Sequence, residues 1–177
     1  MATYECFRLE KKDHVGHLIL NRPDKRNRMS LRFFEELRGI FEAIDEDDDT
    51  RAVLISAEGK SFTAGLDLVE AATLFQDPTA KTRHEFKRMV MRLQEPMNTI
   101  DRCRKPVIAA IHSHCIGGGV DMACVCDIRL ASQDAVFSIR ETRMAMVADL
   151  GTLQRIAAII GQGWTRELAL TGSRRRP

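Results

Sequence analysis

The sequence predicts an α/β fold in which helices cover a parallel sheet. Four short apolar segments, rich in β-branched residues and bounded by charged or turn-forming residues, are typical of buried strands. The segments between them repeat apolar residues at the spacing of amphipathic helices. Because strands alternate with helices along the chain, we expect the strands to lie parallel.

The four strands are predicted at HLILN (17–21), AVLISA (52–57), PVIAAI (106–111) and DIRLAS (127–132). A shorter segment of similar character, VFSI, comes just before Arg140. His112 and His114 are expected to mark the end of the third strand, where the chain leads into a glycine-rich loop.

Two long helices are predicted between these strands. Ser30 is a suitable N-cap for LRFFEELRGIFEAIDED, and the acidic run at 45–49 is expected to end that helix in solvent. The apolar residues that recur in it at helical spacing are Leu31, Phe34, Leu37, Ile40, Phe41 and Ile44. The second helix runs from about Thr79 to Arg102, and Pro96 predicts a break or kink within it. Shorter helices are expected at 120–126, 151–160 and 164–170.

Length and charge exclude several classes of protein. A chain of 177 residues with 44% hydrophobic content can bury one sizeable core, so we expect a single domain spanning 1–177. A net charge of +2 implies no polyanion partner, and the basic segment KRNR at 25–28 is interpreted as a solvated turn, not a nucleic-acid site. No apolar stretch approaches the roughly 18 residues of a membrane span. The N-terminal residues 1–14 are too polar for a secretory signal peptide.

The five cysteines lie within apolar segments, which predicts buried thiols, not a disulfide framework. We therefore expect a reducing, intracellular compartment. Cys124 and Cys126 form a C-x-C pair close to an H-x-H pair, but zinc sites usually have wider spacings. The sequence therefore predicts no metal site.

Three acidic residues follow the glycine triplet at 117–119 and are the candidates for catalysis. Asp121 lies two residues after the triplet, Glu141 follows VFSI, and Asp149 lies in VADLGTLQR. The glycines allow a close approach of backbone to ligand, and the apolar segment after them is expected to start a helix whose N–H groups can face an oxyanion. Carboxyl groups that face such a site could transfer protons.

Each acid also has a purely structural interpretation. Glu141 could pair with Arg140 or Arg143 on the surface, and Asp149 could cap a helix that begins near Gly151. Asp121 could interact with the dipole of its own helix.

Several of these segments together resemble the enoyl-CoA hydratase/isomerase (crotonase) superfamily. AGLDL at 64–68 is similar to the first oxyanion-hole loop of that superfamily, and AAIHSHCIGGGVDMACVCDIRLAS at 109–132 is similar to the second. A weaker similarity extends back through HLILNRPDKRNRMS at 17–30. The placement of the three acids is similar to that in Δ3,5-Δ2,4-dienoyl-CoA isomerases. The resemblance implies a crotonase-like (ClpP/crotonase) superhelix of ββα units.

The resemblance also implies roles for particular residues. The backbone N–H groups of Leu66 and Gly118 match the two oxyanion-hole donors. The loop residues matched to substrate binding are Ala64, Gly65, Leu66, Asp67 and Leu68, together with Gly118. Glu141 matches the position that transfers the α-carbon proton, and Asp149 matches the position that reaches the distal carbon of the diene. Asp121 stands where hydratases usually have a glutamate, and we assign it a supporting role in the pocket.

The activity implied is the isomerisation of 3,5-dienoyl-CoA to 2,4-dienoyl-CoA in fatty-acid β-oxidation. No separate cofactor is expected, because coenzyme A is part of the acyl-CoA substrate. The basic residues Lys25, Arg26 and Arg28 are candidates for contact with its phosphates. Two alternatives stay open: a 2-enoyl-CoA hydratase, and a non-catalytic protein that binds CoA esters.

The resemblance carries two expectations about the whole protein. Members of the superfamily continue beyond the LTG turn that ELALTGSRRRP resembles, so a C-terminal helical region is expected to be missing here. With that region, the resemblance implies a homotrimer or hexamer. It also implies a mitochondrial or peroxisome-like location.

Overall fold

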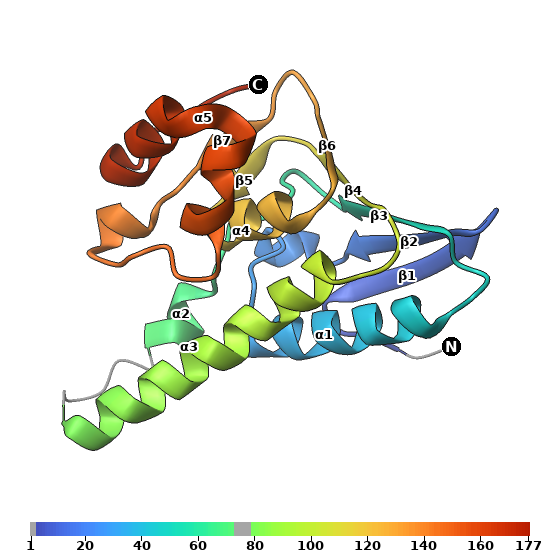
Figure 1. Ribbon diagram of the computed structural model, residues 1–177, viewed down its shortest axis with the longest axis horizontal. Coiled ribbons are helices and arrows are strands. Elements are labelled where there is room, and N and C mark those ends of the chain that lie inside the picture. Colours follow the sequence, from blue (N-terminus) through green and yellow to red (C-terminus); the bar gives the residue numbers. More distant parts are fainter. Residues whose placement is uncertain (1–2, 73–78) are drawn as a thin grey trace.

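The computed structural model describes residues 3–72 and 79–177 and contains two sheets (Figure 1). The larger sheet has the order β1-β2-β3-β4-β6, formed by Phe7–Lys12, Val15–Leu20, Ala52–Ala57, Val107–Ile111 and Ile128–Ala131. The smaller sheet pairs β5 (His114–Ile116) with β7 (Val136–Ser138). All the predicted strands are present, to within two residues at each end.

The sheet is mixed: the four strands predicted from the sequence lie parallel, as expected, and a fifth strand that was not predicted is antiparallel. The strands β2, β3, β4 and β6 pair in parallel, whereas β1 pairs antiparallel with β2. The two strands are joined by Asp13 and His14, which both have positive φ angles, of 50° and 66°. Two such residues match the twist of a tight hairpin. The pattern FRLEKK does not stand out because only Phe7 and Leu9 in it are apolar.

Helix α1 (Leu31–Glu46) begins as predicted from its cap. The side chain of Ser30 accepts a hydrogen bond from the Phe33 N–H, which satisfies one of the donors left free at a helix start. The apolar stripe of α1 is buried against the sheet, and the helix ends at Glu46, within the acidic run at 45–49.

Helix α3 (Ala80–Asp101) runs without interruption through Pro96, so the predicted break does not occur. Thr79 caps its start in a reciprocal arrangement with Thr82. Pro96 lacks the N–H that would bond to the carbonyl of Arg92, and it lies on the buried face of the helix with Leu93, Met97 and Ile100. Helices α1 and α3 pack side by side beneath the larger sheet (Figure 1).

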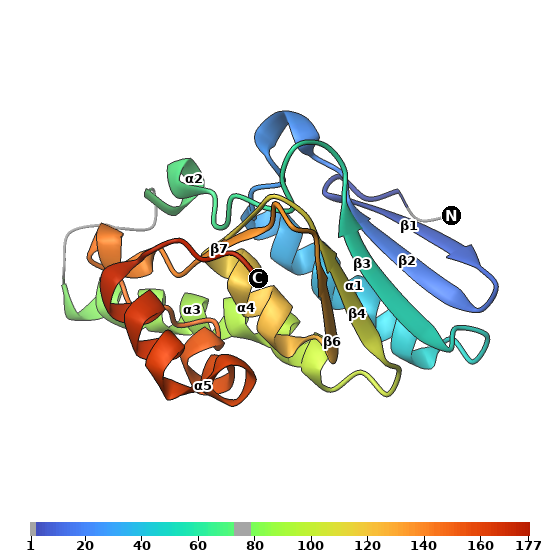
Figure 2. The same ribbon diagram turned by 90° about the horizontal axis from the view of Figure 1, so that it is seen from above.

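The remaining helices surround the glycine-rich loop. Helix α4 (Gly118–Val125) begins two residues earlier than predicted, and α2 (Leu68–Ala72) is a single short turn after the AGLDL loop. Helix α5 (Thr152–Thr171) contains a non-helical residue, Gly161, at φ 78° and ψ 163°, so it consists of two helical pieces, as predicted. It lies beyond α4, away from the larger sheet (Figure 2).

One cluster of buried apolar residues extends from Cys6 to Leu168 and joins the larger sheet to α1, α3, α4 and α5. All five cysteines are free thiols, and Cys6, Cys115 and Cys126 are buried in or beside this core. No helix within 3–72 and 79–177 has both the length and the apolar character needed to cross a membrane.

Candidate active site

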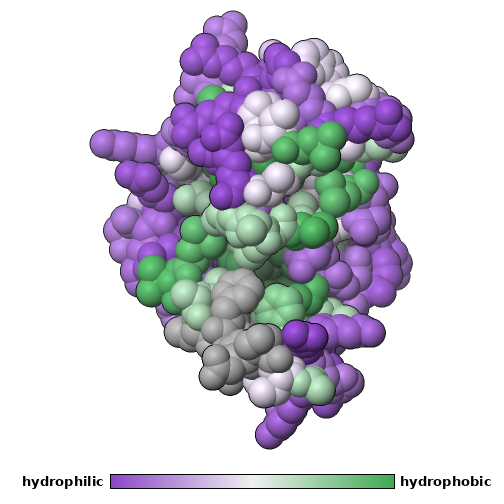
Figure 3. All heavy atoms as spheres, turned by 90° about the vertical axis from the view of Figure 1, so that its left-hand side faces the viewer, coloured by the Kyte–Doolittle hydropathy of each residue, from purple (hydrophilic) through white to green (hydrophobic). Residues whose placement is uncertain are grey.

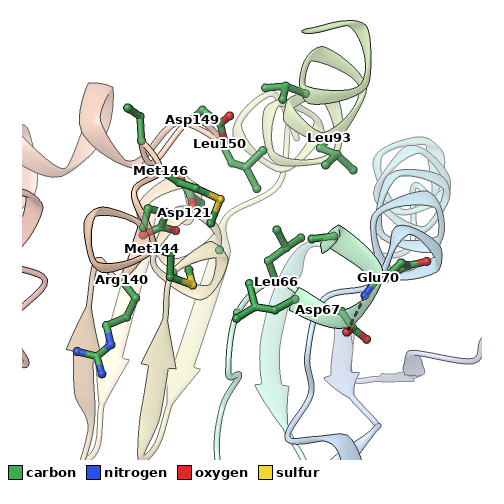
Figure 4. A pocket seen from close by; sticks show the side chains of 18 of the residues that line it. Leu66, Asp67, Glu70, Leu93, Asp121, Arg140, Met144, Met146, Asp149 and Leu150 are labelled. Atoms are coloured by element: carbon green, nitrogen blue, oxygen red, sulfur yellow. Dashed lines mark hydrogen bonds between the residues drawn. The ribbon is translucent and has the colours of Figure 1, made fainter. Parts of the chain in front are cut away.

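A cavity of about 540 Å³ opens where α2 and α3 face α4, the turn η2 (Glu141–Met144) and the loop at 145–150. Figure 3 shows apolar side chains gathered around a hollow on this side of the molecule. Every residue assigned to the site from the sequence lines this cavity: Ala64, Gly65, Leu66, Asp67, Leu68, Gly118, Asp121, Glu141 and Asp149. In Figure 4, Leu66 and Asp67 lie on one wall, and Asp121 and Asp149 lie on the other.

The Leu66 and Gly118 backbone N–H groups are free and close together. Neither group donates a hydrogen bond to any of the described residues. Gly118 is the first residue of α4, where an N–H has no partner within the helix. A Cβ atom built on Gly118 would lie 4.0 Å from the Leu66 nitrogen, so the two loops are in contact.

Gly65 makes this contact of the loops possible. It has a φ of 83°, and a Cβ atom on it would lie 2.6 Å from the carbonyl oxygen of Ile116. Only glycine combines that conformation with so close an approach. The AGLDL loop can therefore lie directly against the glycine triplet.

Glu141 faces the glycine triplet from the opposite side. Its Oε1 lies 3.0 Å from the position of a Cβ atom on Gly117. Its Oε2 is buried and has no hydrogen-bond partner among the described residues. Arg140 and Arg143 instead donate to the carbonyls of Gly172 and Thr171, so the structure does not support a surface ion pair with Glu141.

Burial raises the pKa of Glu141, and the negative charges of Asp121 and Asp149 raise that pKa further. Backbone hydrogen bonds to the carboxyl partly oppose this shift. A carboxyl group with one buried, unpartnered oxygen and a raised pKa is suited to accept and return a proton. Such groups are more frequent at catalytic sites than elsewhere.

Asp149 lies in the loop before α5 and does not cap that helix. The N-cap of α5 is Gly151, and it has no side-chain capping bond. The loop is held instead by Gln94 of α3, whose Nε2 donates to the Asp149 carbonyl oxygen at 2.6 Å. Partial burial raises the pKa of the Asp149 carboxyl.

Asp121 is 1% exposed and caps α5 from the neighbouring helix. Its Oδ1 accepts hydrogen bonds from the Thr152 N–H at 2.7 Å and the Thr152 hydroxyl at 2.6 Å. Burial raises the pKa of Asp121, and the bonds from Thr152 partly oppose that shift. Oδ1 of Asp121 therefore fixes the start of helix α5, directly after the loop that carries Asp149. Asp121 thus supports the position of that loop.

Asp67 stabilises the loop that it lines. Its Oδ1 accepts from the backbone N–H groups of Val69 and Glu70, which caps the short helix α2. Its Oδ2 lies 2.8 Å from Nε of Arg28. Of the three basic residues considered for contact with phosphate, Arg28 is thus paired with an acid of the same site.

The apolar wall contributed by α2 and α3 was not predicted from the sequence. Phe86, Met89, Val90 and Leu93 of α3 line the cavity together with Ala71 of α2. The three- and four-residue spacing of these residues along α3 predicts an apolar helix face. It does not show that this face lines a ligand cavity. The opposite apolar wall is formed by the neighbours of the acids, Met144, Met146, Val147 and Leu150. Among the described residues, no group of three or more His, Cys, Asp and Glu is placed to hold a metal ion.

We expect Glu141→Gln to raise the melting temperature at pH 7 and above. A folded-state pKa above the ordinary value of about 4.3 means that the folded protein binds this proton more tightly than the unfolded chain. Glu141 therefore lowers stability as the pH rises from about 4.3 through the folded-state pKa. The uncharged glutamine removes that loss.

Thermal unfolding of both proteins between pH 4 and pH 8 measures this effect. The gain should shrink as the pH falls towards 4. A gain that is equal at both ends of the range, or a loss at pH 8, would contradict the raised pKa of the Glu141 carboxyl.

The fold and the cavity define a crotonase-like protein. The family model described as enoyl-CoA hydratase/isomerase matches residues 10–177, and the chain belongs to this family.

The chain is similar to the mitochondrial Δ(3,5)-Δ(2,4)-dienoyl-CoA isomerase of Dictyostelium discoideum, with 47% identity over 97% of this chain and 61% of that protein. It is 42% identical to the peroxisomal Δ(3,5)-Δ(2,4)-dienoyl-CoA isomerase of Arabidopsis thaliana, over 97% of this chain and 64% of that protein. The chain thus spans less than two thirds of the length of these relatives.

A solved structure shows the same fold. The crystal structure of an enoyl-CoA hydratase/isomerase from Marinobacter aquaeolei matches with a TM-score of 0.88 and 30% identity. The match covers 98% of this chain and 66% of that one.

Proposed function

We propose that the protein isomerises 3,5-dienoyl-CoA thioesters to 2,4-dienoyl-CoA thioesters. One observation carries this proposal: Glu141, Asp149 and two free backbone N–H groups line the same apolar cavity. The similarity to dienoyl-CoA isomerases of two organisms supports the choice of reaction.

The reaction needs two proton transfers at separate carbons. A carboxylate removes a proton from C2, and the electron pair moves towards the thioester carbonyl to form a conjugated enolate. The N–H groups of Leu66 and Gly118 stabilise the charge on that oxygen, an effect worth about 3–4 kcal/mol for a single donor in acyl-transfer enzymes. A second carboxyl group then protonates C6, which leaves double bonds at C2 and C4. Proton exchange with solvent restores both acids.

The geometry supports Glu141 as the group that acts at C2. Its carboxyl lies against Gly117, next to the Gly118 N–H that would bind the thioester oxygen. C2 is the carbon adjacent to that carbonyl. Asp149, in the loop before α5, lies across the cavity from Leu66 (Figure 4) and would serve the far end of the diene.

Asp121 would take part indirectly, through the start of α5. The Oδ1 atom of Asp121 is already occupied by two hydrogen bonds from Thr152. The aspartate side chain is also shorter than the glutamate that hydratases usually have at this position. This arrangement disfavours activation of a water molecule at that position, as a hydratase would require.

The apolar walls would hold the acyl chain, and coenzyme A would enter as part of the substrate, without a further cofactor. We place the reaction in fatty-acid β-oxidation, in a mitochondrion or peroxisome, because the similar proteins carry those locations in their names.

An assay with a 3,5-dienoyl-CoA, following the growth of 2,4-dienoyl absorbance, tests the function. We expect a turnover number within the usual enzyme range of about 1–10³ s⁻¹. Hydration of crotonoyl-CoA under the same conditions should be slow. Faster hydration than isomerisation would support the hydratase, and thermal stabilisation by a CoA ester without turnover would support a binding protein.

A further inference from the structure

Thr63 connects the two loops that supply the free N–H groups. We propose that Thr63 is a positioning residue that sets the spacing of the Leu66 and Gly118 donors. The inference rests on the proposed function, because it assigns to Thr63 the support of an oxyanion hole.

The hydroxyl group of Thr63 holds the first loop. The side chain is fully buried, and its Oγ1 donates to the carbonyl of Asn27 at 2.7 Å and accepts from the Gly65 N–H at 3.1 Å. Gly65 immediately precedes Leu66. The hydroxyl therefore fixes the residue whose peptide unit carries one of the two donors.

The direction of the Leu66 N–H follows from the same peptide unit. The Gly65 carbonyl accepts a hydrogen bond from the Met29 N–H at 2.8 Å. In a trans peptide the N–H points opposite to the C=O. With both the N–H and the C=O of Gly65 held, the Leu66 N–H is aimed away from Met29 and is left free.

The backbone and methyl group of Thr63 hold the second loop. The Thr63 N–H donates to the His114 carbonyl at 2.9 Å, and the Thr63 carbonyl accepts from the Ile116 N–H at 3.3 Å. These bonds fix strand β5 just before the glycine triplet. The methyl carbon Cγ2 lies 2.3 Å from the position of a Cβ atom on Gly119, in the first turn of α4. One side chain thus contacts both halves of the hole.

Two substitutions separate the contributions of the side chain. Thr63→Val keeps the shape and the methyl group but leaves the Gly65 N–H and the Asn27 carbonyl without a partner. Thr63→Ser keeps the hydroxyl and removes the methyl group. If the hydroxyl sets the loop position, the serine variant should retain most of the activity that the valine variant loses.

We expect Thr63→Val to lower kcat by about 10- to 100-fold, because a small displacement of a catalytic donor has effects of this order. KM should change by less than about threefold, since the acyl and CoA contacts persist. The carbonyl stretch of bound hexanoyl-CoA, a saturated thioester, should move to lower wavenumber in the wild type and less so in Thr63→Val. Infrared difference spectroscopy measures this shift without turnover.

Thr50→Val is the matched control. Thr50 is also a buried threonine, and its hydroxyl donates to Asp47 Oδ2 at 2.6 Å in the turn before β3. Its loss should lower the melting temperature while kcat and the carbonyl shift stay at wild-type values. If Thr50→Val lowered kcat as much as Thr63→Val does, the effect of Thr63 would be one of stability alone, and the proposal would be overturned.

A compensating pair tests the methyl contact. Gly119→Ala places a Cβ atom against Cγ2 of Thr63 and should lower kcat strongly. Thr63→Ser removes Cγ2, so Gly119→Ala/Thr63→Ser should recover at least about tenfold of that loss. No recovery would overturn the assignment of the second loop to Thr63.

The outcomes for the function and for the positioning role are distinct. A wild type that shifts the carbonyl stretch but does not isomerise dienoyl-CoA refutes the proposed reaction, while the Thr63 variants still test positioning through the spectrum. A wild-type spectrum without any shift, or a Thr63→Val variant with both wild-type kcat and wild-type shift, overturns the positioning role.

Discussion

Asp149→Asn is expected to slow the isomerisation by about 10²–10⁴-fold, the range for loss of a general acid or base. The change keeps the size of the side chain and removes the carboxyl that exchanges a proton at C6. Gln94 Nε2 donates to the backbone carbonyl of Asp149 and not to its carboxyl group, so the loop should persist in this variant. Exchange of the C2 protons with deuterated solvent should survive in this variant.

Glu141→Gln should show the opposite result, with exchange of the C2 protons lost and not retained. Because Glu141 lies against Gly117, the residue before the Gly118 donor, it is assigned to C2, and its loss should abolish C2 exchange before it affects exchange at C6. Isomerisation rates and site-resolved deuterium incorporation for both variants make the measurement. Asp48→Asn, a change of an exposed residue in the acidic run after α1, serves as the control with unchanged kinetics.

The two-acid assignment has a definite point of failure. Near-wild-type isomerisation by Asp149→Asn would show that this carboxyl transfers no proton. A loss of C2 exchange in Asp149→Asn together with its retention in Glu141→Gln would reverse the two roles.

Leu66→Pro is expected to lower kcat by about 10²–10³-fold, the effect of losing one oxyanion-hole donor. Proline lacks the backbone N–H. The Leu66 N–H makes no hydrogen bond among the described residues, so the substitution removes a donor without breaking a bond of the fold. Leu66→Ala keeps the N–H and should cost far less.

Comparison of the proline and alanine variants isolates the backbone effect from the side chain. Circular dichroism and thermal unfolding establish that both variants are folded. Equal activity of the two variants would mean that the Leu66 N–H binds no developing charge.

Local signals predicted most of the helices and strands. Ser30 caps α1 because a short polar side chain can accept from an N–H in the first turn, and this requires only neighbouring residues. The strand at 52–57 matched fully because its apolar residues are bounded on both sides by turn-forming or charged residues.

Strand β1 and the uninterrupted course of helix α3 were not predicted, and packing against neighbouring elements decides both. Strand β1 is stabilised by pairing with β2 through a hairpin whose residues, Asp13 and His14, are not the usual glycine-containing pair. Helix α3 continues past Pro96, which lies on the buried face of the helix, where α3 is packed against α1.

The sequence by itself determined the order of most elements, the two glycine-containing loops and the three acids, since each depends on residue type and short-range spacing. Only the tertiary structure decided what each polar group contacts. It brought Asp121 to Thr152 across 31 residues, left Oε2 of Glu141 buried without a partner in the described part of the chain, and placed the methyl group of Thr63 against Gly119. Such contacts depend on how the sheet and helices pack in three dimensions, and a carboxyl group's pKa and a donor's direction are set by that packing.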